Sequence, residues 1–171
     1  MNAASFSAWK KRARAGDPIA QNVVGMAYKY GEVTAQNPTL SLHWFLKLAR
    51  QGDADAQFNL GCIYGKATGS FYRKQRAAPR NDVAAAHWYQ SAAEQYYGPA
   101  QRNLTDMYAE GSQTVPRDRA RAVFCLKRAA AEGDVAASGL AEKLEDELTA
   151  FEKQGLQTME TQWSQRRHIS P

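Results

Sequence analysis

Residues 52–65 read GDADAQFNLGCIYG, and this stretch decides the fold because two other segments repeat its pattern. The others are GDPIAQNVVGMAYKYG, which starts at Gly16, and YYGPAQRNLTDMYAEG, which starts at Tyr96. Each places an Ala-Gln pair four residues after its start, an aliphatic residue four positions later, and a tyrosine four positions after that. This spacing puts the repeated side chains on one face of a helix, so the sequence predicts an array of helical repeats.

A second helix is expected in every repeat. It begins after Asn37, Asn81 or Asp118, whose side chains can accept hydrogen bonds from the first free amides of a helix. The body of this helix reads HWF at 43–45 and HWY at 87–89, whereas the third repeat has Cys-Leu at 125–126. A Gly-Asp pair then ends one helix and caps the next. The chain is therefore expected to be all-α.

The repeat starts divide the chain into five segments. We expect an N-terminal half-repeat capping helix at 1–15, repeats at 16–51, 52–95 and 96–132, and a degenerate repeat with a C-terminal capping helix and tail at 133–171. Two helices of about 12 residues with their turns fill roughly 36 residues, which fits these lengths. Within the last segment, Gly155 is expected to weaken the helix and residues 166–168 to lie in a frayed tail. The helical stripe expected there consists of Leu140, Leu144, Leu148, Phe151, Leu156, Met159 and Trp163.

The pattern G-D-A-x-A-Q-x-N-L-G-x-x-Y, followed by H-W-Y-x-x-A-A, resembles the Sel1-like repeat, a relative of the tetratricopeptide repeat. The resemblance covers about residues 5–145 and departs from the pattern in two places. Thr105 stands where the pattern has glycine, and the second repeat carries about eight extra residues. The resemblance implies a right-handed α/α superhelical solenoid of helix-turn-helix repeats that binds proteins.

The resemblance also implies a binding surface, because the first helix of each repeat would line a concave face. An apolar centre flanked by mixed charge is typical of protein-binding surfaces. The alternative for Met26 and Phe58 is packing between repeats. The side chains expected on the concave face are Ile19, Asn22, Met26, Lys29, Tyr30, Asp55, Phe58, Cys62, Lys66, Arg102, Asp106 and Glu110.

The extra residues form the stretch 66–82, KATGSFYRKQRAAPRND. Basic residues interleaved with aromatic ones can bind an acidic protein or a nucleic acid, and the alternative is an ordinary solvated loop. The resemblance favours an acidic protein partner over nucleic acid. The candidate contact residues of this basic loop are Phe71, Tyr72, Arg73, Lys74 and Arg76.

Composition excludes several classes of protein. With 44% hydrophobic and 23% charged residues, the 171-residue chain has the composition of a soluble globular protein, and no run approaches a membrane span. The basic residues at 10–14 interrupt any signal-like apolar stretch, so we expect a cytoplasmic protein without a membrane partner. Two cysteines, Cys62 and Cys125, are expected to be free thiols, and the three histidines show no metal-ligand spacing.

No catalytic constellation is apparent, so we expect neither an enzyme nor a bound cofactor or metal. The favoured interpretation is a bacterial-type adaptor or scaffold that binds a protein or peptide in its concave groove. An immunity or inhibitor protein that neutralises one specific enzyme is the alternative, and nucleic-acid binding through the basic stretches ranks third. The protein is expected to be a monomer, or a weak dimer through its C-terminal helix.

Overall fold

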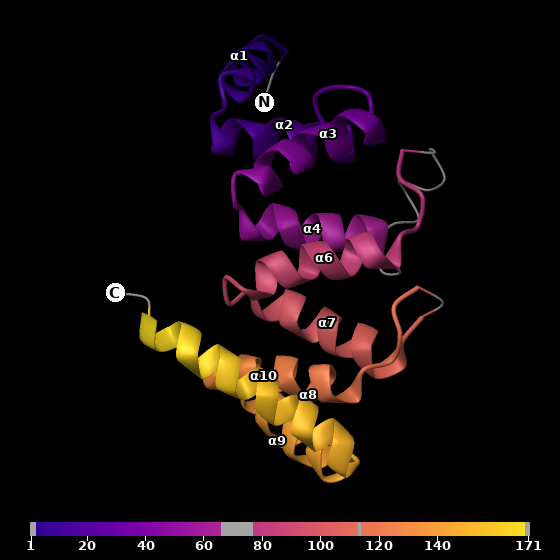
Figure 1. The fold of residues 1–171 in the computed structure, drawn as a ribbon. Helices are drawn as coiled ribbons and strands as arrows, with labels where there is room; N and C mark the ends of the chain where they lie inside the picture. The colour runs from indigo at the N-terminus through magenta and orange to yellow at the C-terminus, as the bar shows by residue number, and fades with distance from the viewer. Residues whose placement is uncertain (1–2, 66–76, 113, 170–171) are drawn as a thin grey trace. The chain divides into compact units, whose positions relative to one another are not determined.

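The computed structural model describes residues 3–65, 77–112 and 114–169, and these are helices joined by turns and short connections, without a strand (Figure 1). They divide into two compact units, Met1–Gln95 and Tyr96–Pro171, which we call unit 1 and unit 2. Unit 1 contains α1 (Ala3–Arg14), α2 (Pro18–Tyr30), α3 (Pro38–Arg50), α4 (Ala54–Tyr64) and α6 (Asp82–Ala93). Unit 2 contains α7 (Gly98–Glu110), α8 (Arg119–Ala131), α9 (Val135–Asp146) and α10 (Ala150–Ile169).

Local capping explains where most helices begin. Asp17, Asp53 and Asp134 each accept a hydrogen bond from the backbone amide three residues later, which satisfies a free donor at the start of α2, α4 and α9. The glycine before each of these aspartates has a positive φ of 92–98°, a conformation that suits glycine. Asn37, Asn81 and Asp118 cap α3, α6 and α8 in the same way, as the sequence predicts.

The start of α7 differs from the other first helices. Tyr96 stands in the glycine position with a φ of 63°, and it is the one described non-glycine residue with a positive φ. Tyr97 stands in the aspartate position and makes no side-chain capping hydrogen bond. Unit 2 therefore begins at a junction that carries backbone strain and lacks a cap.

Unit 1 is built from helices that pack on their neighbours in the chain. A first core joins α1, α2 and α3 through side chains such as Phe6, Val24 and Trp44, and a second joins α3 and α4 around Phe45 and Leu60. Buried glutamines tie the repeats together. The Gln21 amide donates to the carbonyl oxygen of Ala13 at 3.3 Å, and the Gln57 amide donates to that of Ala49 at 3.1 Å.

The contact between α4 and α6 is very close. Gly61 lies directly against the ring of Tyr89, and a Cβ atom on Gly61 would overlap that ring. The Tyr89 side chain is 3% exposed, and its hydroxyl donates to the sulfur of Cys62 at 3.4 Å. The repeat therefore needs a glycine at position 61 because a large aromatic side chain occupies the opposite helix.

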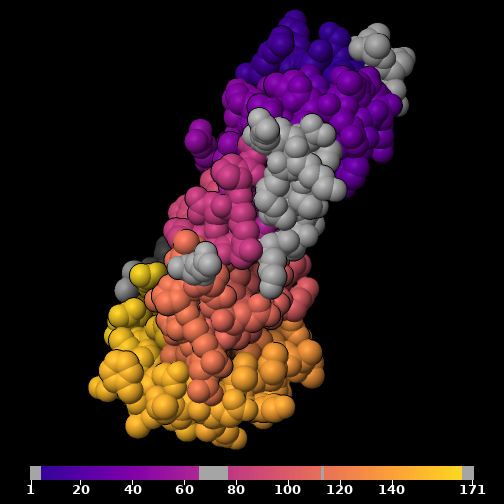
Figure 2. Space-filling view, turned by 90° about the vertical axis from the view of Figure 1, so that its right-hand side faces the viewer, coloured from indigo at the N-terminus to yellow at the C-terminus, as the bar shows by residue number. Residues whose placement is uncertain are grey.

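In unit 2, α8 packs against α7 and α9, and α10 lies across α8. The α10 contact contains the buried side chains Val123, Leu148 and Leu156. In Figure 2 the orange side chains of α8 and the yellow ones of α10 lie side by side on one surface. The Nζ atom of Lys127 reinforces this contact, since it reaches carboxylate oxygens of Glu145 and Glu160, each at 2.7 Å.

The C-terminal segment ends in one long helix. α10 continues through Gly155 and reaches Ile169, so residues 166–168 belong to the same helix. The weakening at Gly155 and the fraying expected at 166–168 stay predictions. Gly155 is exposed, and a Cβ atom added to it would have nothing within 4 Å, so no packing breaks the helix there. The cost of one helical glycine, about 1 kcal/mol, is smaller than the gain from packing α10 on α8.

The apolar stripe predicted at 140–163 lies on two helices, α9 and α10, and the turn between them, rather than on one helix. The chain turns between α9 and α10, so Leu140 is 45% exposed and Phe151 is 84% exposed, whereas Leu148 and Leu156 are buried. The turn is fixed by a capping box, in which Thr149 and Glu152 exchange hydrogen bonds of 2.8 and 3.3 Å. The sequence TAFE at 149–152 carries this signal, which the spacing of the apolar residues does not reveal.

Candidate functional site

An exposed apolar surface runs along α2, the first helix of the first repeat. Ile19 is 66% exposed and Tyr30 is 56% exposed, while Val23 and Met26 between them are half-buried. These four side chains follow one another at spacings of four, three and four residues, so they form one continuous stripe on the helix. We call Ile19, Val23, Met26 and Tyr30 the α2 seam.

The opposite face of α2 holds the seam in place. Ala20, Val24 and Ala27 are buried in the core shared with α1 and α3. Gln21 is buried too, and its side-chain oxygen accepts a hydrogen bond of 2.8 Å from the Gln51 amide. α2 is therefore fixed along one side, whereas Ile19 and Tyr30 are exposed on the other. Met26 lies between them and packs partly against the core of α3 and α4, which is the packing between repeats that the sequence left as its alternative. The Lys29 ammonium lies 5.1 Å from the centre of the Tyr30 ring at the end of the seam.

α4 places its candidate residues at different depths. Asp55 is exposed, and Phe58 is half-buried, with its ring centre 5.9 Å from that of Tyr89. Cys62 is buried beneath the Tyr89 hydroxyl, so its thiol is not offered to a partner. Sequence reasoning placed Cys62 on the open face because the repeat spacing does not reveal how far an opposite tyrosine reaches.

α7 carries a polar open face. Arg102 is exposed and lies 3.4 Å from a carboxylate oxygen of Asp134, the residue that caps α9. Asp106 and Glu110 are both exposed and lie one helical turn apart. Burial raises the pKa of Asp106 above its ordinary value, and the neighbouring charge of Glu110 raises it further. This face carries charges where α2 carries apolar side chains.

The basic loop lies almost wholly outside the described residues. Lys66, Phe71, Tyr72, Arg73, Lys74 and Arg76 belong to the stretch 66–76, which the structure does not describe. In the part that follows, Ala78 is buried in the core of α3 and α4, and Arg80 pairs with Asp82 at 2.9 Å. The interpretation of the loop as a contact surface stays a prediction.

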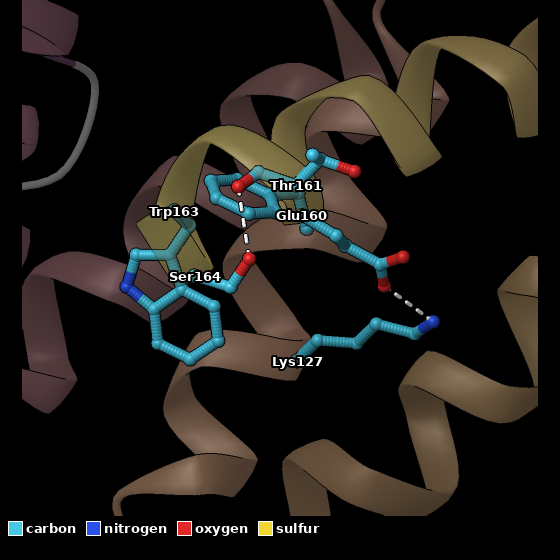
Figure 3. Close-up of a pocket in the computed structure, with 6 residues that line it drawn as sticks. Lys127, Glu160, Thr161, Trp163 and Ser164 are labelled. Atoms are coloured by element: carbon cyan, nitrogen blue, oxygen red, sulfur yellow. Dashed lines mark hydrogen bonds and ion pairs between the residues drawn. The ribbon is translucent and has the colours of Figure 1, made fainter. Parts of the chain in front are cut away.

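A hollow of about 440 Å³ lies between α8 and α10 (Figure 3). Trp163 stands on one side of it and packs edge-to-face on Phe124, with ring centres 6.2 Å apart. The Glu160–Lys127 ion pair closes the other side, as the dashed line in Figure 3 shows. Sequence reasoning named Trp163 but missed this hollow, because Lys127 and Glu160 are 33 residues apart and share no motif.

The cysteines do not suit nucleophilic chemistry. Both are free and buried. Burial raises the pKa of the Cys125 thiol to about 12, so this thiol stays protonated at neutral pH. Within the described stretches, no group of three or more histidine, cysteine, aspartate or glutamate side chains is arranged to hold a metal ion. No helix in those stretches is long and apolar enough to cross a membrane.

The paired helices, the repeated caps and the glycine-to-aromatic contacts together define a helical-repeat solenoid. A family model of the Sel1 repeat matches three consecutive segments, residues 18–53, 54–97 and 98–134. The chain belongs to the Sel1 repeat family. The family and the all-α solenoid that the sequence predicts are both confirmed, and repeats of this family generally mediate protein–protein interactions and are typically non-catalytic.

The solved structures that are similar to this chain include two proteins of this fold. One is a Sel1 repeat protein from Oxalobacter formigenes, which is 31% identical with a TM-score of 0.66, over 82% of this chain and 54% of that one. The other is a protective antigen present in uropathogenic Escherichia coli strains that displays an SLR fold. It is 27% identical with a TM-score of 0.65, over 85% of this chain and 30% of that one.

The chain thus spans about half the length of the first of these proteins and less than a third of the second. No protein of curated function is similar enough to this chain to count as a match.

Proposed function

We propose that this chain is a protein-binding module that holds a protein or peptide partner against the open faces of α2 and α4 in unit 1, and that the open face of α7 in unit 2 is a separate contact surface. The observation that carries the proposal is the α2 seam, where two large apolar side chains, Ile19 and Tyr30, are more than half exposed on a helix that is otherwise firmly packed. Exposed apolar side chains that lie together mark interaction sites, whereas scattered ones need no explanation.

The other candidate contact residues are those that the repeat pattern places on the open faces of the first helices. In unit 1, Asn22 and Lys29 lie beside the seam on α2, and Asp55 and Phe58 are the candidate residues on α4. In unit 2, the separate polar surface of α7 consists of Arg102, Asp106 and Glu110. A binding surface with an apolar centre and a polar rim is the arrangement that protein interfaces use. Burial of an apolar side chain against a partner contributes about 1.5–3 kcal/mol, so Ile19 and Tyr30 are expected to dominate the affinity.

The test is partner capture with seam variants of the full chain. The immobilised protein is exposed to extract of its source organism, and captured proteins are quantified by mass spectrometry for the wild type, Ile19→Glu and Tyr30→Glu. Val83→Glu is the matched control, because Val83 is 55% exposed on α6 and lies off the seam. A partner that uses the seam is recovered with the wild type and with Val83→Glu, and its recovery falls about tenfold or more with either seam variant.

Equal recovery of every captured protein by the folded seam variants would contradict the proposal. The same experiment separates an adaptor from an inhibitor once a partner is known. If that partner is an enzyme, its turnover is measured with and without a stoichiometric amount of this protein. A loss of turnover that Tyr30→Glu relieves supports an inhibitor or immunity protein, and unchanged turnover supports an adaptor.

A further inference from the structure

The spacing of the α2 seam indicates the shape of the segment that fits it. Apolar residues separated by four, three and four positions follow the a/d spacing of a two-helix seam, in which side chains of one helix insert between those of another. From Ile19 to Tyr30 the seam extends for about 16 Å along the helix, or about three turns. An amphipathic helix of similar length offers a stripe that matches it.

The backbone of α2 argues against the other common way of binding a peptide. An extended peptide binds by adding a strand to a free sheet edge, where main-chain donors and acceptors are unpaired. α2 is a helix whose first free amide is capped by Asp17 and whose end is closed by a hydrogen bond from the Gly31 amide to the Ala27 carbonyl. The seam therefore offers side chains and no backbone hydrogen bonds to a partner.

The net charge of unit 1 indicates which charge a helix bound at the seam would carry. Residues 1–95 contain 12 lysines and arginines against 6 aspartates and glutamates, whereas residues 96–171 contain 10 against 11. Two ion pairs within the unit, Asp17 with Arg12 and Asp82 with Arg80, remove one acid and one base each and leave the excess of positive charge unchanged. Lys29 adds a positive charge at the end of the seam. A positive surface attracts an acidic partner and repels a basic one.

We propose that the α2 seam binds an acidic amphipathic α-helix of the partner, with apolar residues at alternating spacings of three and four and carboxylates along its flanks. The inference rests on the proposed function and adds the conformation and charge of the bound segment. Lys29 faces a flank of the bound helix and selects for negative charge, while the apolar seam supplies most of the affinity.

The experiment selects ligands from a displayed library of random 18-residue peptides, using the intact protein as bait. The expected ligands carry apolar residues at three- and four-residue spacings and a net negative charge, and their circular dichroism shows helix on binding. Their affinity is expected to fall with added salt, because salt screens the attraction between Lys29 and the carboxylates of the peptide. Lys29→Glu weakens a selected peptide about threefold to tenfold in low salt, the size expected of one charge at an interface rim.

Lys47→Glu is the matched control, because Lys47 is an exposed lysine beside an aromatic ring of the same unit but lies on α3, away from the seam. It is expected to change the affinity less than twofold. Selected peptides that are neutral or basic, or that bind without forming helix, would overturn the inference, and so would a selection that enriches no peptide. The proposed function fails separately, if Ile19→Glu and Tyr30→Glu leave partner capture from extract unchanged.

Discussion

The α4–α6 pair of unit 1 and the α7–α8 pair of unit 2 are built on the same repeat but fill their contacts differently. In the first pair, glycine at position 61 faces Tyr89. In the second, the equivalent positions hold Thr105 and Leu126, which are both buried. The smallest residue, glycine, is paired with the large tyrosine, whereas the larger threonine is paired with the smaller leucine. The two pairs therefore keep the same architecture with different side chains. The Thr105 hydroxyl also donates a hydrogen bond of 3.0 Å to the Gln101 carbonyl oxygen.

The open faces of the first helices differ more than their packed faces. α2 presents the apolar seam, whereas α7 presents Arg102, Asp106 and Glu110 at positions that correspond to Asn22, Met26 and Tyr30. These side chains are less constrained by packing than the buried ones, although Met26 packs partly on the α3–α4 core and Arg102 pairs with Asp134. The repeat pattern therefore specifies the buried contacts between helices and leaves the exposed side chains of the first helices variable.

The largest effect is expected from Gly61→Ala. A Cβ atom at this position overlaps the buried ring of Tyr89, and overpacking of this kind costs about 1–3 kcal/mol. We expect the free energy of unfolding to fall by an amount near the upper end of that range, measured by urea unfolding followed with far-UV circular dichroism. Combining Gly61→Ala with Tyr89→Leu, as in the α7–α8 pair, restores part of the loss. Gly155→Ala is the control and gains about 0.5–1 kcal/mol, because that glycine is exposed and unobstructed.

The junction before α7 can be converted into the junction found elsewhere in the chain. The double change Tyr96→Gly and Tyr97→Asp removes a positive-φ tyrosine and supplies the missing cap, so it is expected to stabilise the protein by about 1–2 kcal/mol. The opposite change, Asp53→Ala, removes the cap of α4 and is expected to lower the free energy of unfolding by about 1 kcal/mol. Thermal unfolding measures both, and a double variant that is less stable than the wild type would show that the two tyrosines make contacts worth more than the cap.

Lys127→Met tests the two ion pairs by which Lys127 of α8 joins Glu145 of α9 and Glu160 of α10. It leaves Glu145 and Glu160 without their shared cation, and a loss of about 1 kcal/mol is expected for these partly exposed groups. Burial lowers the pKa of Lys127, but the hydrogen bonds that its ammonium donates to the two glutamates outweigh this effect and the pKa is raised overall. The stabilisation is therefore present at neutral pH and lost as the pH rises through the raised pKa, above the ordinary lysine value. A free energy of unfolding of Lys127→Met equal to that of the wild type at pH 7 would contradict a structural role for these ion pairs.

The smallest effect concerns the acidic pair on α7. The pKa of Asp106 is raised, so its carboxylate form opposes folding at neutral pH, and stability rises as the pH falls through that pKa. Asp106→Asn is expected to stabilise the protein by roughly 0.2–0.5 kcal/mol at pH 7, the size of a like-charge pair one turn apart. The gain disappears below about pH 3, where Asp106 is itself neutral. Asp55→Asn is the control, because Asn59 rather than an acid lies one turn further along α4.

Much of the fold follows from the sequence because its signals are local. The capping residues Asn37, Asn81 and Asp118 and the Gly-Asp junctions act within three or four residues of themselves, so their effect can be read without knowing the tertiary structure. The candidate site follows less well. The register placed Ile19 and Tyr30 on the open face of α2, where they are exposed, but it also placed Cys62 on the open face of α4, where it is buried.

What the sequence by itself determined is the array of helix pairs, since a repeat spacing and its caps need only neighbouring residues to act. What only the tertiary structure decided is which side chains of a helix reach solvent. Tyr89 covers Cys62 from 27 residues away, and Glu160 reaches Lys127 from 33 residues away. Such contacts depend on how two helices cross and how far a side chain extends, and neither is encoded in a spacing along one helix.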